Sequence, residues 1–442
     1  MKRIQTGAGL GGLLALMLAI PAQAQTVDLE YELRAGGTYS DNVERTASNE
    51  IDSFAAVLGA RVRGGKDTGR LQFALSSDVA YYEYLDSAVD GELVGSAFAQ
   101  SSYEFVPDTF SWELDGSFAQ IRESLLRPAG PGNRDDVLTF STGPTVSGRF
   151  GDAFEAQLEG RYTTSTYSNR DFDNDTLGAR LVVGRRLSAR SLVGVGVAFD
   201  DVTYDSQLGL GSFDFERREA FVRFQAEAAR TSLSIDAGYA QVEGPNVDDS
   251  GPMVRLEATR QLSPFISGFL AYTQQYPTSD APALVPADAL DRDVLGDGSI
   301  LTAAPRVAKS GEIGLRLNRP RTFAELAYAQ TRETGLIVAS GDRSLDSFRA
   351  SVGRNFSPRS NGQIFALLTT EDLPVLTADA DELSVGAELS LTFGRNLGLD
   401  FRVEYRDREG ATALDTYTEI GAGVFLRYGR IARASASSAA LR

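Results

Sequence analysis

The residues best equipped to act on another molecule are charged side chains. They recur at every second position in segments where polar and apolar residues alternate. Positions two apart lie on one face of a β-strand, so these residues share a face of the predicted sheet. Carboxylates and guanidinium groups arranged in this way can select ions and polar solutes. They also suit a hydrated interior in which opposite charges pair across strands. The candidate lumen-lining residues are Arg34, Arg61, Glu113, Glu159, Arg161, Arg223, Glu312, Arg316, Glu388, Arg402, Glu404 and Arg406.

Composition excludes several kinds of active site. The 442 residues include no Cys and no His. Without histidine, the commonest catalytic base and metal ligand is missing, and histidine-dependent hydrolases do not fit. Without cysteine, there is no disulfide, thiolate metal site or lipid-anchor cysteine. We therefore expect no enzyme and no cofactor, and the formal net charge of -17 argues against a nucleic-acid partner, which needs basic patches.

One acidic segment partly matches a calcium-binding loop. Asp291, Asp293 and Asp297 lie close together, but Leu295 occupies a ligand position and no glutamate closes a 12-residue loop. We expect a solvated acidic loop and no metal site. The segment belongs to the longest predicted loop, Pro277 to Pro305, which either stays outside or folds into a lumen as a constriction.

The element that positions the charged residues is an amphipathic strand, and the last one, Tyr417 to Tyr428, shows it most clearly. Ile420, Val424, Leu426 and Tyr428 fall on one face, and small or charged residues fall on the other. The same alternation recurs from Asp28 onward, whereas a helix would need apolar residues three and four apart. We predict an all-β fold, a single transmembrane up-and-down antiparallel barrel of about 20 strands, with a range of about 18–22.

Connections between the predicted strands alternate in length, which is expected of an outer-membrane barrel with short periplasmic turns and long extracellular loops. The predicted long loops include Gly244 to Ser250 and Glu371 to Asp381. Proline is excluded from paired strand interiors, so Pro144 is expected at a bulge or a strand end. Aromatic girdles are predicted at both strand ends. Tyr39, Tyr81, Tyr84, Tyr167, Tyr204 and Tyr276 lie toward the long loops, and Phe105, Phe110, Phe150, Phe265, Phe323 and Phe393 lie beside the short turns.

The amino terminus predicts secretion. Lys2 and Arg3 precede an apolar run from Leu10 to Ile20, and Ala22 to Ala24 is a small-residue cleavage site. The run is too short for a transmembrane anchor. We expect a cleaved signal peptide over residues 1–24, a barrel over 25–430 and a short tail over 431–442.

Two resemblances refine this picture. Gly423-x-x-Leu426-x-Tyr428 resembles the carboxy-terminal assembly signal of outer-membrane barrels, which implies the barrel-assembly machinery and outer-membrane lipid of a Gram-negative bacterium as partners. Residues 36 to 60, with Gly37-Thr38-Tyr39-Ser40-Asp41-Asn42-Val43, resemble the beta-barrel porin 2 family. That family is described with exopolysaccharide and capsule systems, so the resemblance implies a barrel that passes polysaccharide, and it carries no catalytic residues.

Three hypotheses for the function follow. The first is a porin-like channel for polar solutes or exopolysaccharide. The second is a non-conducting structural or surface-interaction barrel whose acidic loops bind an external partner. The third is a soluble secreted all-β protein, which would share the overall composition because the two faces of a barrel cancel in the average.

Overall fold

A computed structural model describes residues 28–48, 50–67, 69–85, 89–122, 128, 130–151, 153–169, 173–205, 214–276, 306–335, 342–373, 378–410 and 415–429. The predicted signal peptide (1–24), the segment 277–305 and the tail 431–442 lie outside the described residues. Where the structure describes the chain, no helix is long and apolar enough to cross a membrane.

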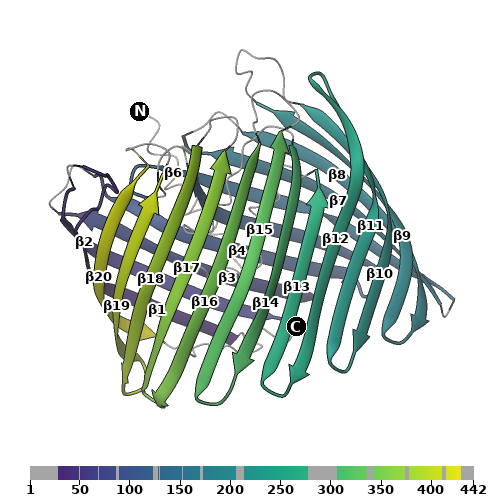
Figure 1. Cartoon of the computed structure of the whole chain (residues 1–442). Helices are drawn as coiled ribbons and strands as arrows, with labels where there is room; N and C mark the ends of the chain where they lie inside the picture. The colour runs from purple at the N-terminus through teal and green to yellow at the C-terminus, as the bar shows by residue number, and fades with distance from the viewer. Residues whose placement is uncertain are drawn as a thin grey trace.

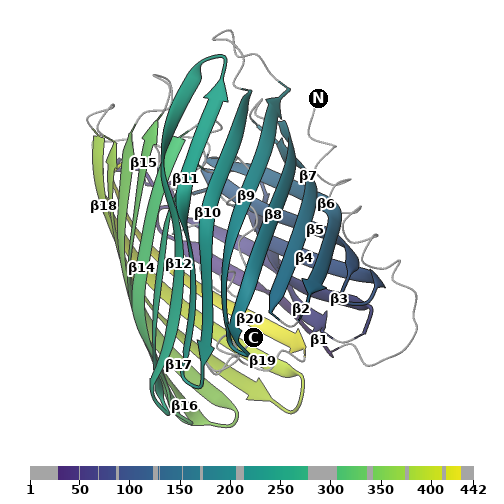
Figure 2. The same cartoon turned by 90° about the vertical axis from the view of Figure 1, so that its right-hand side faces the viewer.

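The described chain is a closed antiparallel barrel of 20 strands, which confirms the predicted fold (Figure 1). Each strand pairs with the next one in sequence, and β20 pairs with β1 to close the sheet (Figure 2). At this seam Leu33 lies opposite Tyr428 and Tyr39 lies opposite Ala422, as the amphipathic last strand predicts. The strands are β1 (Asp28–Ser40), β2 (Ser53–Lys66), β3 (Leu71–Tyr84), β4 (Glu92–Val106), β5 (Phe110–Arg122), β6 (Arg134–Phe150), β7 (Phe154–Tyr167), β8 (Asn174–Ser188), β9 (Ser191–Tyr204), β10 (Phe215–Ala228), β11 (Thr231–Gly244), β12 (Val247–Ser263), β13 (Ile266–Gln275), β14 (Arg306–Asn318), β15 (Thr322–Gly335), β16 (Arg343–Ser357), β17 (Ser360–Leu373), β18 (Ala378–Phe393), β19 (Leu397–Glu409) and β20 (Tyr417–Gly429).

The alternation of residue types explains why these segments form one sheet with two different faces. In β20, Ile420, Val424 and Leu426 are 55%, 47% and 51% exposed, and exposed large apolar side chains recur on the same face of the other strands. A continuous apolar band of this extent suits a hydrocarbon environment and not water. The apolar face is therefore the outer surface of a barrel that crosses a membrane, and its closure leaves no unpaired strand edge in lipid.

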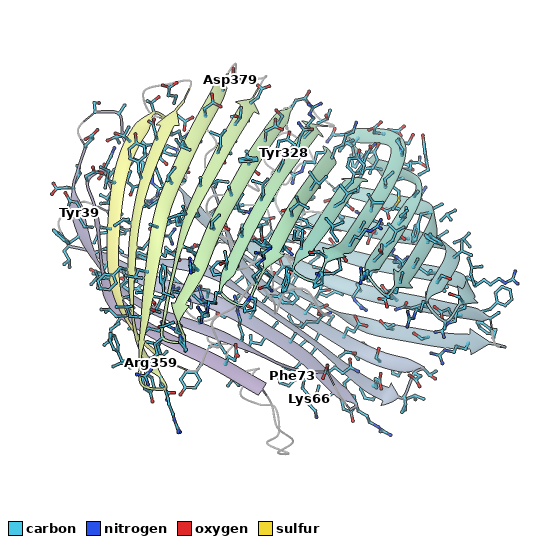
Figure 3. The ribbon with its side chains drawn as sticks, turned by 60° about the horizontal axis from the view of Figure 1, so that its bottom comes forward. Tyr39, Lys66, Phe73, Tyr328, Arg359 and Asp379 are labelled. Atoms are coloured by element: carbon cyan, nitrogen blue, oxygen red, sulfur yellow. The ribbon has the colours of Figure 1, made fainter. Side chains whose placement is uncertain are left out.

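The barrel has two different rims. At the short-turn rim, β1 begins, β20 ends and tight turns join successive strands, such as residues 358–359 between β16 and β17. The long-loop rim lies at the opposite ends of the strands. Figure 3 shows Lys66, Phe73 and Arg359 at the first rim and Tyr39 and Asp379 at the second, with Tyr328 near the middle of β15.

The predicted bounds of two long loops are wrong. β11 runs to Gly244 and β12 starts at Val247, so a tight hairpin replaces the loop predicted from Gly244 to Ser250. Glu371 and Asp381 lie inside β17 and β18 and not in a loop, and they pair with Ala380 and Thr370. The sheet extends past the apolar band at these places because backbone hydrogen bonds hold a ladder together whatever side chains it carries.

Pro144 neither ends a strand nor shifts the register, contrary to the prediction. It lies inside β6 opposite Trp112. On the β7 side, Thr142 pairs with Tyr162 and Thr145 with Glu159, so the register is the same before and after the proline. A Cβ atom at Gly143 would lie 1.9 Å from the carbonyl oxygen of Gly160, so glycine is needed for this close approach of the two backbones.

The aromatic girdles differ in part from those predicted. Phe150, Phe265 and Phe393 are 64%, 44% and 50% exposed at the short-turn rim, as expected. Phe323 instead turns inward, where its ring would lie 2.0 Å from a Cβ atom at Gly353. At the long-loop rim Tyr167, Tyr204 and Tyr276 are buried. The exposed tyrosines near this rim include Tyr81, Tyr162 and Tyr239.

Candidate functional site: the ion-paired inner face

The polar face of the sheet is the concave one, because its side chains meet across several strands. Arg180 on β8 donates to Asp236 on β11 over 3.0 Å, although β9 and β10 lie between them. Neighbouring strands are about 4.8 Å apart, so side chains three strands apart can touch only where the sheet curves toward them. The charged side chains therefore point to the inside of the barrel.

Arg34 and Arg61, two of the predicted lining residues, bind the same carboxylate. Arg34 pairs with Asp78, and Arg61 Nε donates to the other oxygen of Asp78 over 2.8 Å. The cluster spans β1, β2 and β3. Next to it, Arg427 binds Glu32 at 3.1 Å and Asp400 at 2.9 Å, so ion pairs also cross the seam of the barrel.

Glu113 and Arg161 form an ion pair between β5 and β7, and the hydroxyl of Thr145 on β6 donates to Glu113 over 2.9 Å. Glu159 instead accepts a hydrogen bond of 2.9 Å from Gln157.

Arg223 is held by Asp236, which it contacts with Nε and Nη2 at 2.8 and 2.7 Å. Asp236 is 5% exposed and also binds Arg180, so a single carboxylate balances two guanidinium groups. A second pair, Arg255 with Glu219, continues this cluster with distances of 2.9 and 3.0 Å.

Glu312 and Arg316 belong to a ladder of alternating charge across β14, β15 and β16. Arg349 donates to Glu312 over 3.0 Å and lies 3.4 Å from Glu325. Glu325 in turn accepts from Arg316 over 3.0 Å.

The remaining predicted residues form a row on β18 and β19. Arg402 lies 3.6 Å from Glu388 and 3.0 Å from Glu404, and Arg406 donates to Glu404 over 2.8 Å. Arg406 also lies 3.7 Å from Glu419 of β20. The predicted residues are thus brought together in separate clusters around the wall and not in one central site.

Aromatic rings on the inner face lie flat against the sheet because glycines leave room for them. A Cβ atom at Gly196 would lie 2.3 Å from Cζ of Phe221, and the same distance separates a Cβ at Gly314 from Phe269. Guanidinium groups cover these rings, Arg180 at 4.9 Å from the centroid of Phe221 and Arg316 at 4.4 Å from that of Phe269. The arrangement recurs at Phe365. A Cβ atom at Gly386 would lie 2.3 Å from Cζ of Phe365, and the guanidinium of Arg402 lies 5.4 Å from the centroid of this ring.

At the long-loop rim, the connection between β1 and β2 binds the start of β20. Asn42 is fully buried and donates to the carbonyl oxygens of Thr46 and Thr418 over 2.8 and 2.9 Å. Arg45 donates to Glu419 over 2.9 Å. Burial alone would lower the pKa of Arg45, but Glu419, Tyr417 and Glu382 together outweigh it and the pKa is raised. We call residues 41–48 the seam latch, because they join the first hairpin to the last strand.

A buried chain of charges continues around this rim. Arg343 binds Glu371 at 3.1 Å, Glu371 lies 3.5 Å from Arg408, and Arg408 donates to Asp415 over 2.9 Å. Glu382 also accepts from Arg408 over 3.2 Å. These ion pairs hold the strand ends together at the rim, beyond the apolar band.

Sequence reasoning missed several members of these clusters. Asp78, Arg180 and Asp236 have the parity of the predicted residues, so the same rule would have found them. The seam latch had no comparable signal, since a connection between strands has no periodicity. Among the described residues, no group of three or more acidic side chains is arranged to hold a metal ion.

Comparisons with known proteins give no family. No family model matches the chain, and no curated protein matches it. The resemblance of residues 36 to 60 to the beta-barrel porin 2 family therefore assigns no family.

The solved structures that resemble the chain include a siderophore receptor, an iron transporter and OccK2. The siderophore receptor PirA from Pseudomonas aeruginosa has 12% identity and a TM-score of 0.43, over 92% of this chain and 81% of that one. The FrpB iron transporter from Neisseria meningitidis (F5-1 variant) has 11% identity and a TM-score of 0.46, over 92% and 83%. OccK2 (OpdF) from Pseudomonas aeruginosa has 11% identity and a TM-score of 0.38, over 92% and 99%. Likeness at this level assigns neither a family nor a solute.

The chain's own geometry supports a broader assignment. It combines a closed sheet, an exposed apolar outer band and a charged, ion-paired inner face. Only helices and closed barrels satisfy every backbone polar group in lipid, and barrels of this kind belong to the outer membrane of Gram-negative bacteria. The chain is an outer-membrane β-barrel protein.

Proposed function

We propose that the barrel is a porin-like channel for polar solutes. The observation that carries the proposal is that three aromatic side chains of the inner face lie close against the wall, with guanidinium groups over them. Phe221, Phe269 and Phe365 lie on glycines, and guanidinium groups lie on the rings. A barrel of about 20 strands is wider than those that side chains fill, so flat side chains favour a water-filled passage.

The proposed solutes are neutral and hydroxyl-rich, such as sugars. Carboxylates and guanidinium groups alternate along the wall and compensate one another, as in the ladder of Glu312, Arg349 and Glu325. Such a surface offers both donors and acceptors to a sugar hydroxyl without strongly favouring one sign of charge. Exopolysaccharide is the polymeric form of this solute class, and it is proposed on the resemblance of residues 36 to 60 alone.

The experiment is planar-bilayer conductance of the refolded protein with sugars of increasing size as blockers. We expect discrete current steps that small sugars interrupt. The variant Glu388→Lys adds positive charge to the inner face and should shift the reversal potential in a salt gradient toward anion selectivity. Glu409→Lys is the control, because Glu409 is an exposed residue at the end of β19 with outward parity.

Absence of current steps at any voltage would overturn the channel and favour the alternative function, a non-conducting structural or surface-interaction barrel. Equal shifts of the reversal potential in both variants would show that ions do not pass the predicted lining. We also propose, on sequence grounds, that residues 1–24 are a cleaved signal peptide and that the barrel-assembly machinery inserts the mature chain.

A further inference from the structure

The outer surface carries opposite charges at its two rims. At the long-loop rim, exposed carboxylates dominate: Glu83, Glu243, Asp248, Asp379, Asp381 and Glu409. At the short-turn rim, exposed arginines dominate, and we call the following set the arginine belt: Arg185, Arg260, Arg319, Arg354, Arg359 and Arg395. Exposed carboxylates of the short-turn rim include Asp67, Asp108 and Glu227. Figure 3 shows Arg359 and Asp379 at opposite ends of the barrel.

Members of the arginine belt lie at the level of the outer aromatic girdle. Arg354 shares its face of β16 with Val352 and Phe356, which are 51% and 61% exposed. Arg185 lies 5.8 Å from the ring centroid of Phe154, and Arg319 lies 5.7 Å from that of Phe265. An aromatic ring at the edge of the apolar band marks the boundary between hydrocarbon and headgroups. The guanidinium groups therefore lie at headgroup depth.

The long-loop rim is built differently at the same kind of boundary. The hydroxyl of Tyr81 donates to Glu83 over 2.8 Å, and that of Tyr162 donates to Asp175 over 2.9 Å. Tyr328, near the middle of β15, binds Asp346 in the same way. These three tyrosines thus bind carboxylates of the chain itself, whereas two rings of the short-turn rim lie beside exposed cations.

We propose that the arginine belt binds the phosphate groups of anionic phospholipids in the periplasmic leaflet of the outer membrane. Short turns face the periplasm in barrels of this kind, so the belt meets a phospholipid leaflet. A guanidinium group matches two phosphate oxygens with a planar pair of donors, and basic residues near an anionic leaflet are attracted to it. The belt then fixes the depth and direction of the barrel in the membrane, whether or not the lumen conducts.

The experiment compares lipid binding by the full-length barrel in detergent. Native mass spectrometry would count the bound lipids after addition of equimolar phosphatidylglycerol and phosphatidylcholine. We expect phosphatidylglycerol adducts to dominate for the unaltered protein. The double variant Arg319→Gln/Arg354→Gln should lower this preference by about fivefold, and Arg319→Lys/Arg354→Lys should keep most of it.

The control variant is Arg218→Gln/Arg332→Gln, which removes two exposed arginines of outward parity near the long-loop rim. It should keep the preference, and heat-modifiable gel mobility would show that all variants are folded. If the Arg319→Gln/Arg354→Gln variant and the unaltered protein prefer phosphatidylglycerol equally, the proposal is overturned. An acidic periplasmic protein would then be the partner to test. An equal loss in the control variant would overturn it too, because net charge alone would then explain the binding.

Discussion

From the packing of the inner wall we predict that adding a single methyl group at Gly196, by the substitution Gly196→Ala, will destabilise the barrel. Gly196 on β9 lies opposite Phe221 on β10, whose ring is 4% exposed and lies beneath Arg180 and Arg223. The Gly196→Ala variant would place its Cβ atom 2.3 Å from Cζ, 2.5 Å from Cε2 and 2.9 Å from Cε1 of that ring. Nothing but the ring lies that close, so the ring must move.

The size of the effect follows from the displacement. Ordinary contact between carbon atoms is about 3.5–4.0 Å, so the ring has to rise by roughly 1.2 Å or more. Overpacking of this kind costs about 1–3 kcal/mol. The raised ring also disturbs its contact with Arg180, which is worth about 1 kcal/mol. We expect Gly196→Ala to lower the free energy of unfolding by about 2–4 kcal/mol.

The assay is equilibrium unfolding of the refolded barrel in lipid vesicles by guanidinium. The chain has one tryptophan, Trp112, which is 43% exposed on the outer face and so reports the loss of the lipid environment. Gly421→Ala is the matched control, because a Cβ atom at this inward glycine of β20 would meet only the carbonyl oxygen of Tyr39, at 3.8 Å. That variant should unfold almost like the unaltered protein.

Phe221→Leu tests the cause in the Gly196→Ala background. A smaller side chain removes the clash, so the double variant should be more stable than the sum of the two single changes predicts. If Gly196→Ala and Gly421→Ala unfold at the same guanidinium concentration, the flat packing of Phe221 on the wall is refuted.

Three further changes test other parts of the molecule. Asp236→Asn removes the carboxylate that balances Arg180 and Arg223, and because both arginines remain partly exposed to water we expect a loss of about 1–3 kcal/mol in the same unfolding assay. Asn42→Ala leaves the carbonyl oxygens it binds without this donor, so we expect the heat-modifiable band to convert at a lower temperature, with a loss of about 1–3 kcal/mol. Deletion of Tyr417–Tyr428 should abolish membrane assembly, whereas removal of 431–442 should have a mild effect, and fractionation of outer membranes measures both; an essential tail would show that the last strand is misplaced.

The fold could be predicted because lipid imposes a strict rule on each strand. An outward polar residue is costly near the midplane, so alternation such as that of Ile420, Val424 and Leu426 recurs in the strands that the structure describes. The rule ends with the apolar band. Glu371 and Asp381 lie past it, where polarity no longer distinguishes a paired strand from a loop. Pro144 was misjudged because one missing N–H removes one ladder bond without changing the register.

The contacts of the inner face were less predictable than its composition. Parity identifies which residues share a face, but it does not reveal that Arg180 reaches Asp236 past two strands, which depends on the curvature of the closed sheet. The aromatic residues show a related limit. Phe323 lies beside a short turn in the sequence, yet its parity turns it inward onto Gly353. A girdle residue must lie near the end of a strand and also on the outer face of the sheet, and the first property does not imply the second.

The seam latch has a consequence for the order of folding. The hydrogen bond from Asn42 to Thr418 joins positions 376 residues apart. Closing a flexible loop of that length costs about 5 kcal/mol in chain entropy, whereas each hairpin closes a short loop. Hairpins should therefore form first and the seam last. Until then the sheet has two free edges that could accept a foreign strand. Contacts of Ser40, Asn42 and Arg45 with β20 favour closure of the barrel over pairing with a foreign strand. The seam latch therefore stabilises the product of the last step of assembly.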